Sequence, residues 1–347
     1  MSFGATGLVE SRERSTGTAL WRRSVTELFD PAACGGTRVL EGMRRRIVVL
    51  LLVAGVLGSP AIYAAGGVVA EIPIEVERGK TIVPVTMGGV TLRLILDTGL
   101  PYDGILVFHR EKVDTEAGTW SRSAVSGAGP GGGVPTLTNE SGSFAVGPVA
   151  LANQRIIVLD SDIYKGFPTD GVIGYSLLGH YAVRIDFDAK AMTLYDPQTF
   201  SPEAGWDSLP IYFKDNRIPW IDLDVATADE PPARLSAYID SASRETLELL
   251  RRDANRFTLP ATTTKRHLGR GLSGDIYGEE GTIARVRIGD HELESVRVAI
   301  ALASTRSRQR DADAIVGNGV LSRFHVVFDY AGERLHIRPN AHFGDPF

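Results

Sequence analysis

Short stretches rich in apolar and β-branched residues alternate along the chain with glycine-rich and polar turns. Stretches of this kind and length predict β-strands. The predicted strands include 82–85, 90–96, 144–146, 156–159 and 183–187 in the first half, and 218–225, 236–239, 282–288, 296–301 and 326–328 in the second. Short helices are predicted at 175–181 and 246–252. The pattern therefore indicates a mainly β protein.

The two halves of this pattern repeat each other. Segments 170–186 and 313–329 share Asp, Gly, Leu, Val and Asp at five equivalent positions without a gap, and segments 94–99 and 237–242 lie at the same offset of 143 residues. A match in register over about 100 residues indicates two copies of one fold. We therefore predict an internal duplication: two similar β-barrel lobes, over 70–200 and 206–340, joined by 197–206 and separated by a cleft.

In each copy an apolar strand ends at an aspartate, which is followed by a hydroxyl residue and a small residue. The two motifs are Asp97-Thr98-Gly99 and Asp240-Ser241-Ala242. Two carboxyl groups that meet across a two-fold axis cannot both ionise, so they share a proton. The ionised group can activate water while the neutral group donates a hydrogen bond to a substrate carbonyl. We expect the Thr and Ser hydroxyls to bridge to the other lobe and hold the pair rigid.

These motifs resemble those of the aspartic peptidases. Asp97-Thr98-Gly99 is similar to the family's Asp-Thr/Ser-Gly signature. Gly174 and Gly317, each preceded by two apolar residues, resemble its second element, a strand that threads behind the catalytic loop. The resemblance covers about 70–340 and implies acid-protease-type lobes, a catalytic Asp97/Asp240 dyad and no cofactor or metal. The short lobes look more like a fused retropepsin dimer than like pepsin lobes.

The resemblance also implies two flaps, the glycine-rich hairpins 127–133 and 269–278. Their candidate residues are Gly127, Gly129, Gly269, Gly271 and Tyr277.

Two positions depart from the family pattern. Ala242 stands where the family has Gly, which adds a methyl group and keeps the N–H. Leu100 stands where a small or hydroxyl residue is usual, whereas Ser243 keeps that pattern in the second copy. We therefore expect an asymmetric site in which Asp240 has the more polar surroundings.

Composition and the remaining motifs exclude several other classes. The 347 residues are 43% hydrophobic and 23% charged, as in a globular protein, and the formal net charge of −5 argues against a nucleic-acid-coating protein. The single cysteine, Cys34, excludes an internal disulfide and a cysteine-based metal cluster. Segment 79–81 ends like a phosphate-binding loop, but Ile74 occupies the position that needs glycine, so we predict a hairpin turn. The sequence has no His-Glu-x-x-His motif, and its serines lack the Gly-x-Ser-x-Gly frame.

The N-terminal region does not have the pattern of a folded domain. Residues 1–42 show no clear periodicity, whereas 43–66 contain three arginines, the apolar run 47–58 and an alanine-rich end. This order is typical of a secretory signal peptide. We therefore interpret 1–42 as an upstream extension, Met43 as the true start, and the protein as extracytoplasmic, periplasmic or secreted. An uncleaved membrane anchor through 47–65 is the alternative.

The sequence thus predicts an exported, monomeric aspartic endopeptidase that acts on peptides or unfolded proteins. A non-catalytic peptide-binding protein on the same fold is the first alternative, because Ala242 replaces glycine. An enzyme with paired carboxylates of another class, such as a glycosidase, is the second, although it has no reason to repeat the motif. Asp97 and Asp240 could also simply cap turns. Asp186 and Asp329 are expected to have structural roles in turns.

Overall fold

The computed structural model describes residues 67–347, apart from 215–216, 228–229, 303 and 305–310. The predicted extension 1–42, the signal peptide or anchor within 43–66, and Cys34 lie outside the described residues. Within the described part of the chain, no helix has both the length and the apolar character needed to cross a membrane.

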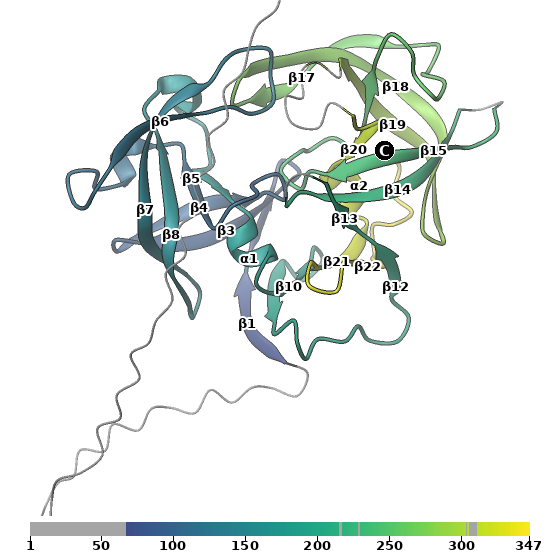
Figure 1. Ribbon diagram of the computed structural model, residues 1–347. Coiled ribbons are helices and arrows are strands. Elements are labelled where there is room, and N and C mark those ends of the chain that lie inside the picture. The colour runs from purple at the N-terminus through teal and green to yellow at the C-terminus, as the bar shows by residue number, and fades with distance from the viewer. Residues whose placement is uncertain (1–66, 215–216, 228–229, 303, 305–310) are drawn as a thin grey trace, which may run out of the picture. The chain divides into compact units, whose positions relative to one another are not determined.

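The first copy of the repeat forms an eight-stranded sheet (Figure 1). Its strands are β2 (Glu75–Glu77), β3 (Lys80–Met87), β4 (Val90–Leu96), β5 (Gly104–Val107), β6 (Ser121–Val125), β7 (Val134–Val146), β8 (Val149–Leu159) and β9 (Gly171–Ile173). The strand order is β2-β3-β4-β9-β5-β8-β7-β6, and β3 also pairs with β7. This additional pairing curls the sheet toward a barrel.

The second copy forms an eight-stranded sheet with the same connectivity. Its strands are β13 (Tyr212–Phe213), β14 (Pro219–Ala226), β15 (Ala233–Ile239), β16 (Leu247–Arg251), β17 (Thr264–Gly271), β18 (Gly274–Ile288), β19 (His291–Leu302) and β20 (Ala314–Val316). The order β13-β14-β15-β20-β16-β19-β18-β17, with an additional β14–β18 pairing, matches the first sheet strand for strand. The predicted mainly β fold of two similar lobes is therefore confirmed.

A third sheet, which the sequence did not predict, joins the two copies. It contains β1 (Val68–Pro73), β10 (Ala182–Asp186), β11 (Ala191–Tyr195), β12 (Asp207–Pro210), β21 (Phe324–Asp329) and β22 (Arg334–Pro339), in the order β1-β11-β10-β21-β22-β12. At its centre β10 and β21 pair antiparallel, with Val183 opposite Phe328 and Ile185 opposite Val326. These four residues exchange places under the 143-residue offset, so the pairing itself is two-fold symmetric.

The helices are short, and one of the two predicted helices is a strand. They are α1 (Tyr175–Leu178), α2 (Asn318–Leu321) and the 3₁₀ turns η1 (Arg110–Lys112) and η2 (Asp162–Tyr164). The helix predicted at 246–252 is wrong, because this segment forms strand β16. Leu247, Leu249 and Leu250 are all fully buried there, and the strand pairs with both β19 and β20. A strand buried on both faces has a continuous apolar sequence, which resembles that of a short helix.

Candidate active site

The two motif aspartates stand directly after equivalent strands. Asp97 follows β4, which runs parallel to its neighbour β9, and Asp240 follows β15 beside the parallel strand β20. The N–H of Asp97 donates to the Ile173 carbonyl at 2.8 Å, and that of Asp240 to the Val316 carbonyl at 2.9 Å. Each loop is therefore fixed to the strand that precedes a glycine of the second element.

Those two glycines lie directly against the loops. A Cβ atom on Gly174 would stand 2.2 Å from the carbonyl oxygen of Asp97. A Cβ atom on Gly317 would stand 2.2 Å from the carbonyl oxygen of Glu245. Real Cβ atoms do not approach backbone oxygens this closely, so any side chain at either position would displace the loop.

The hydroxyl residues after the aspartates tie the two copies together. Thr98 Oγ1 donates to the Ile239 carbonyl at 2.7 Å and accepts from the Ser241 N–H at 3.0 Å. Ser241 Oγ donates to the Leu96 carbonyl at 2.8 Å and accepts from the Thr98 N–H at 3.0 Å. Both side chains are buried. Four reciprocal hydrogen bonds therefore join the loops of Asp97 and Asp240.

The two carboxyl groups receive different numbers of backbone hydrogen bonds. Asp97 Oδ1 accepts from the Gly99 N–H at 2.7 Å. Asp240 Oδ1 accepts from the N–H groups of Ala242 at 3.0 Å and Ser243 at 2.9 Å. Hydrogen bonds to a carboxylate favour its charged form. The site is therefore asymmetric, and the negative charge is better stabilised on Asp240.

Burial and a neighbouring charge affect the ionisation of Asp97. Burial and, next, the charge of Asp240 raise the pKa of Asp97 to about 7, against the smaller opposing effects of the Gly99 N–H and Lys80. Asp97 is thus neutral in mildly acidic solution. Its carboxyl group can then donate a hydrogen bond, as the acid member of an acid–base pair must.

The two glycine-rich hairpins meet at their tips. The Gly131 N–H donates to the Ser273 carbonyl at 2.6 Å, and the Ser273 N–H donates to the Ala128 carbonyl at 2.9 Å. Ser273 Oγ also accepts from the Gly127 N–H at 3.2 Å and donates to the Gly132 carbonyl at 3.1 Å. The turn between β6 and β7 is therefore bonded to the turn between β17 and β18.

The flap glycines and the flap tyrosine candidate have different surroundings. A Cβ atom on Gly129 would stand 2.5 Å from the Ser273 carbonyl carbon, and one on Gly271 would stand 2.2 Å from the Ala128 carbonyl oxygen. Gly269 lies at an irregularity in the pairing of β17 with β18. Tyr277 is 68% exposed and its ring contacts that of His267. Because side chains alternate along a strand, Tyr277 points away from the face of β18 that buries Ile276.

Sequence reasoning missed the role of two buried aspartates that precede the second-element strands. Asp170 Oδ2 accepts from the Arg93 N–H at 2.9 Å, and Asp313 Oδ2 accepts from the Ser236 N–H at 3.1 Å. Both side chains brace the strand that leads to a motif aspartate. The repeat did match these two positions, and that match was the available signal.

Sequence reasoning also missed Lys80. A hairpin turn does lie here, but at Arg78 and Gly79 and not over 79–81, since Glu77 pairs with Lys80 across it and Lys80 and Thr81 belong to β3. The ammonium group of Lys80, however, donates to the Ala242 carbonyl in the other copy. The sequence pattern places Lys80 in a hairpin turn and cannot show which loop its side chain reaches.

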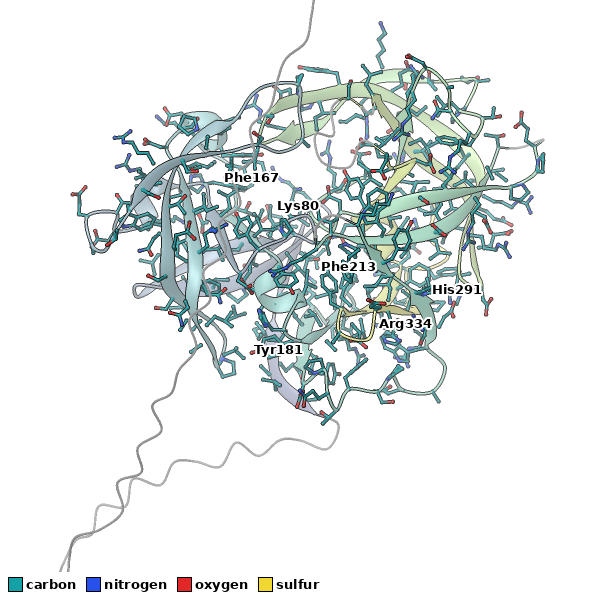
Figure 2. The ribbon with its side chains drawn as sticks, viewed as in Figure 1. Lys80, Phe167, Tyr181, Phe213, His291 and Arg334 are labelled. Atoms are coloured by element: carbon teal, nitrogen blue, oxygen red, sulfur yellow. The ribbon has the colours of Figure 1, made fainter. Side chains whose placement is uncertain are left out.

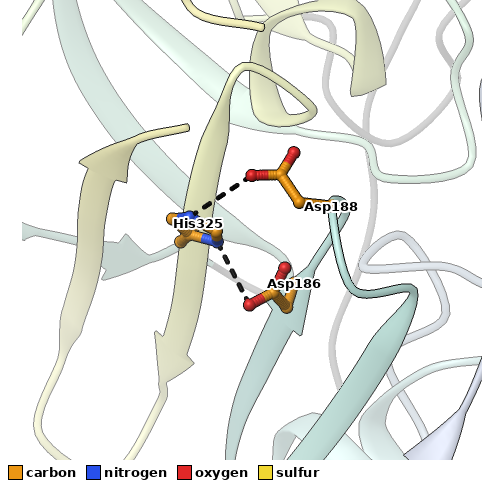
Figure 3. Close-up of side chains that lie close together, drawn as sticks. All are labelled: Asp186, Asp188 and His325. Atoms are coloured by element: carbon orange, nitrogen blue, oxygen red, sulfur yellow. Dashed lines mark ion pairs between the residues drawn. The ribbon is translucent and has the colours of Figure 1, made fainter. Parts of the chain in front are cut away.

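A second cluster of ionisable groups lies in the six-stranded sheet (Figure 3). His325 Nδ1 stands 3.4 Å from Asp186 Oδ2 and His325 Nε2 stands 3.6 Å from Asp188 Oδ2. These donor types could hold a metal ion, and their atoms lie within 4.8 Å of one another. However, Arg184 also contacts Asp186 Oδ2, at 3.2 Å, and the two histidine nitrogens face different carboxylates. The arrangement fits a histidine that contacts two carboxyl groups better than a metal site.

The two aspartates predicted to have structural roles do stabilise turns. Asp186 Oδ1 accepts from the Ala189 N–H, and Asp329 Oδ1 accepts from the Gly332 N–H, both at 2.9 Å. That prediction is confirmed.

Comparisons with known proteins give a distant structural likeness. A scan against protein-family models finds no match, and a search of curated proteins finds none either. Among solved structures, the chain is similar to an aspartic proteinase from Irpex lacteus, with a TM-score of 0.49 and 13% sequence identity, over 78% of this chain and 97% of that one. A likeness this distant carries no inference about activity, so the function depends on the geometry of the site itself.

Proposed function

We propose that the protein is an aspartic endopeptidase that hydrolyses peptide bonds with a water molecule activated by Asp97 and Asp240. The observation that carries this proposal is the reciprocal bonding of Thr98 and Ser241. Two aspartates that only cap turns in separate lobes would not require these hydrogen bonds between their loops. It brings the loops of both aspartates together, where their charges interact.

The mechanism follows from the asymmetry of the two carboxyl groups. Asp240 accepts a proton from water, whose oxygen attacks the scissile carbonyl carbon, while Asp97 gives its proton to the carbonyl oxygen. A tetrahedral diol results. Asp240 then passes its proton to the amide nitrogen, the C–N bond breaks, and one hydroxyl of the diol returns its proton to Asp97. The products are a carboxylic acid and an amine, and the dyad regains its starting state.

The substrate class rests on the hairpins. Two glycine-rich turns that are bonded to each other form a cover that has to open for an extended chain and close again over it. We therefore propose peptides or unfolded proteins as substrates.

The test is cleavage of a reduced, alkylated protein between pH 3 and pH 7. The wild type should release fragments, and Asp97→Asn or Asp240→Asn should each lower kcat/KM by several orders of magnitude. The double variant should lower kcat/KM little further, because the effects of groups that act as a unit are not additive. Asp162→Asn is the matched control, since that carboxyl group is 87% exposed. Wild-type rates in a folded Asp97→Asn variant would refute the proposal.

The non-catalytic alternative has its own signature in the same experiment. A peptide-binding protein would retain an unfolded chain on a column without cutting it, and the wild type would then release no fragments at any pH. Ala242→Gly separates a degenerate site from a non-enzyme, because only a degenerate site regains cleavage.

Two further parts of the proposal concern the whole protein. We propose export, with a mature chain that begins near 65–70, and N-terminal sequencing from the native host tests it. A cytosolic protein that begins at Met1 would contradict it. We also propose that a monomer suffices, because one chain supplies both aspartates. Specific activity should then not fall on dilution.

A further inference from the structure

Lys80 is the cationic side chain that reaches from the first copy to the aspartate loop of the second. It is the first residue of β3, directly after the turn at Arg78 and Gly79. Figure 2 labels it in the middle of the molecule, between the strands of the two copies. Its ammonium group donates to the carbonyl oxygen of Ala242, two residues beyond Asp240.

The backbone around Lys80 is fixed to the second copy as well. Asn318 Nδ2 donates to the Gly79 carbonyl at 3.0 Å, and Thr81 Oγ1 lies 3.4 Å from the same amide nitrogen. Thr81 and Asn318 are buried. The position of the Lys80 side chain is therefore set by contacts on both sides of it in the sequence.

The charges around Lys80 belong mostly to the candidate active site. The groups that act on it are Asp240, Asp97, Arg244 and Glu245. Burial lowers the pKa of Lys80, and the two motif aspartates oppose that effect. Glu245 has cationic partners of its own in Arg244 and Arg266. The two motif aspartates are therefore the anions that act most strongly on Lys80.

The phenols that act on Asp97 do not compete with Lys80. Tyr164 and Tyr330 both interact with Asp97, and burial raises the pKa of each phenol. Both phenols are therefore neutral over the pH range in which a carboxyl dyad titrates.

Lys80 has no charged counterpart at the equivalent position of the second copy. Ile82 lies opposite Ile95 in the first copy, and Trp220 lies opposite Tyr238, the counterpart of Ile95, in the second. Counting back two residues, the counterpart of Lys80 is Ile218, which is buried and apolar. The position equivalent to Lys80 in the second copy therefore carries no charge.

We propose that Lys80 is a positioning residue of the Asp97/Asp240 dyad. It holds the Asp240 loop through the Ala242 carbonyl, and its charge keeps the dyad in the singly ionised state at more acidic pH than the two carboxyl groups would reach alone. This inference rests on the proposed function for its effect on catalysis, whereas its effect on the ionisation of the dyad can be measured in a protein that cleaves nothing.

The sign of the effect is fixed by electrostatics. A neighbouring positive charge favours a carboxylate over a carboxylic acid, so it lowers the pH at which each proton leaves the dyad. Removing the charge should therefore move both limbs of the pH–rate profile to higher pH, by about one unit for an opposite charge that acts on both carboxyl groups. A merely structural role would lower the rate and leave both midpoints in place.

The experiment compares four variants with the wild type. Lys80→Met removes the charge and the hydrogen bond, and Lys80→Gln removes the charge but can still donate to the Ala242 carbonyl. Lys80→Arg restores the charge. Lys165→Met, which removes an ammonium group that is 78% exposed, is the matched control.

Two readouts keep the inference separate from the proposed function. The first is the pH dependence of kcat/KM, and the second is a ¹³C NMR titration of carboxyl-labelled aspartates, with Asp97→Asn for assignment. We expect Lys80→Met and Lys80→Gln to shift the dyad titration upward by about one pH unit, and Lys80→Arg and Lys165→Met to leave it near the wild type. If the wild type cleaves nothing but the Lys80 variants show this shift, only the proposed function is contradicted. An unshifted titration in folded Lys80→Met, or a Lys80→Gln titration like that of the wild type, overturns the role of Lys80.

Discussion

At the residue scale, two hydroxyl groups join the loops of Asp97 and Asp240. Thr98 Oγ1 and Ser241 Oγ each donate once and accept once, and all four bonds cross between the copies. A hydroxyl has one proton to donate, so neither group has an unused donor. Because the side chains are buried, water cannot replace a lost partner, and the loss of either hydroxyl should cost stability as well as geometry.

Ser241→Ala should therefore be strongly destabilising. It leaves the Thr98 N–H and the Leu96 carbonyl without these partners, at a cost of about 3 kcal/mol in the free energy of unfolding. Urea denaturation measures that cost. Ser236→Ala is the matched control, because its hydroxyl bonds to the exposed Asp222, and it should change stability by less than about 0.5 kcal/mol. Equal effects of the two substitutions would contradict the interpretation.

Gly99 and Ala242 occupy equivalent positions and should respond differently to exchange. A Cβ atom on Gly99 would stand 2.9 Å from Asp97 Oδ1, so Gly99→Ala should displace that carboxyl group and lower kcat/KM at least about tenfold. Ala242 already keeps its N–H bond to Asp240 with a methyl group in place. Ala242→Gly should preserve or raise activity and cost about 1 kcal/mol of stability. Loss of activity in Ala242→Gly with full activity in Gly99→Ala would reverse this assignment.

At the element scale, the tips of the two glycine-rich hairpins are bonded to each other. Backbone bonds through Ser273 join the two turns, and its hydroxyl adds two more contacts, to Gly127 and Gly132. The glycines of the tips permit the approach, since Cβ atoms at Gly129 and Gly271 would collide with the opposite backbone. Under the proposed function, entry of an extended peptide requires these bonds to break together.

Ser273→Ala should therefore loosen the tips without touching the dyad. The backbone bonds remain, but loss of the hydroxyl contacts should speed amide hydrogen exchange at Gly127 by about tenfold. Ser123→Ala, an exposed position on β6, is the control and should leave exchange unchanged. Unaltered exchange at Gly127 in Ser273→Ala would mean that the backbone bonds alone hold the tips.

The element scale also shows why sequence prediction succeeded in part. Strands with one solvent-facing side, such as β4 and β14, carry a pattern that a single sequence reveals. β16 does not, because pairing on both edges and burial on both faces override the local preference of Leu247–Arg251. The repeat gave the positions of Asp97 and Asp240 because equal spacing reflects equal connectivity. It could not give the Lys80 contact, since that depends on how the copies face each other.

The six-stranded sheet connects the halves at the scale of the whole molecule. Its strands come from both ends of both copies, so no local pattern predicts their pairing. It also contains carboxyl groups whose pKa is lowered in the folded protein, Asp186 and Asp329 among them. The groups of this sheet and Asp97 at the candidate site therefore both make stability depend on pH, in opposite directions.

On the neutral side, the candidate site should limit stability. The pKa of Asp97 is about 7 in the folded protein, against an ordinary value of 3.8. Its stabilising contribution is thus complete below pH 3.8 and is lost as the pH rises through 7. Asp97→Asn should flatten the decline in the urea midpoint between pH 4 and pH 7. A decline as steep as that of the wild type would contradict this.

On the acidic side, the six-stranded sheet should limit stability. Burial would raise the pKa of Asp186, but the Ala189 N–H, His325 and Arg184 together hold it below its usual value. A carboxyl group with a lowered pKa stabilises the folded state above its unfolded pKa, and this contribution disappears as the pH falls through the folded value. Asp186→Asn should therefore cost about 1 kcal/mol at pH 6 and progressively less below pH 4. Thermal unfolding at pH 6 and pH 2.5 measures both values, with the exposed Asp162→Asn as control. If Asp186→Asn cost as much at pH 2.5 as at pH 6, ionisation of Asp186 would not be the source of the acid limit, and its contacts with His325 and Arg184 would serve packing alone.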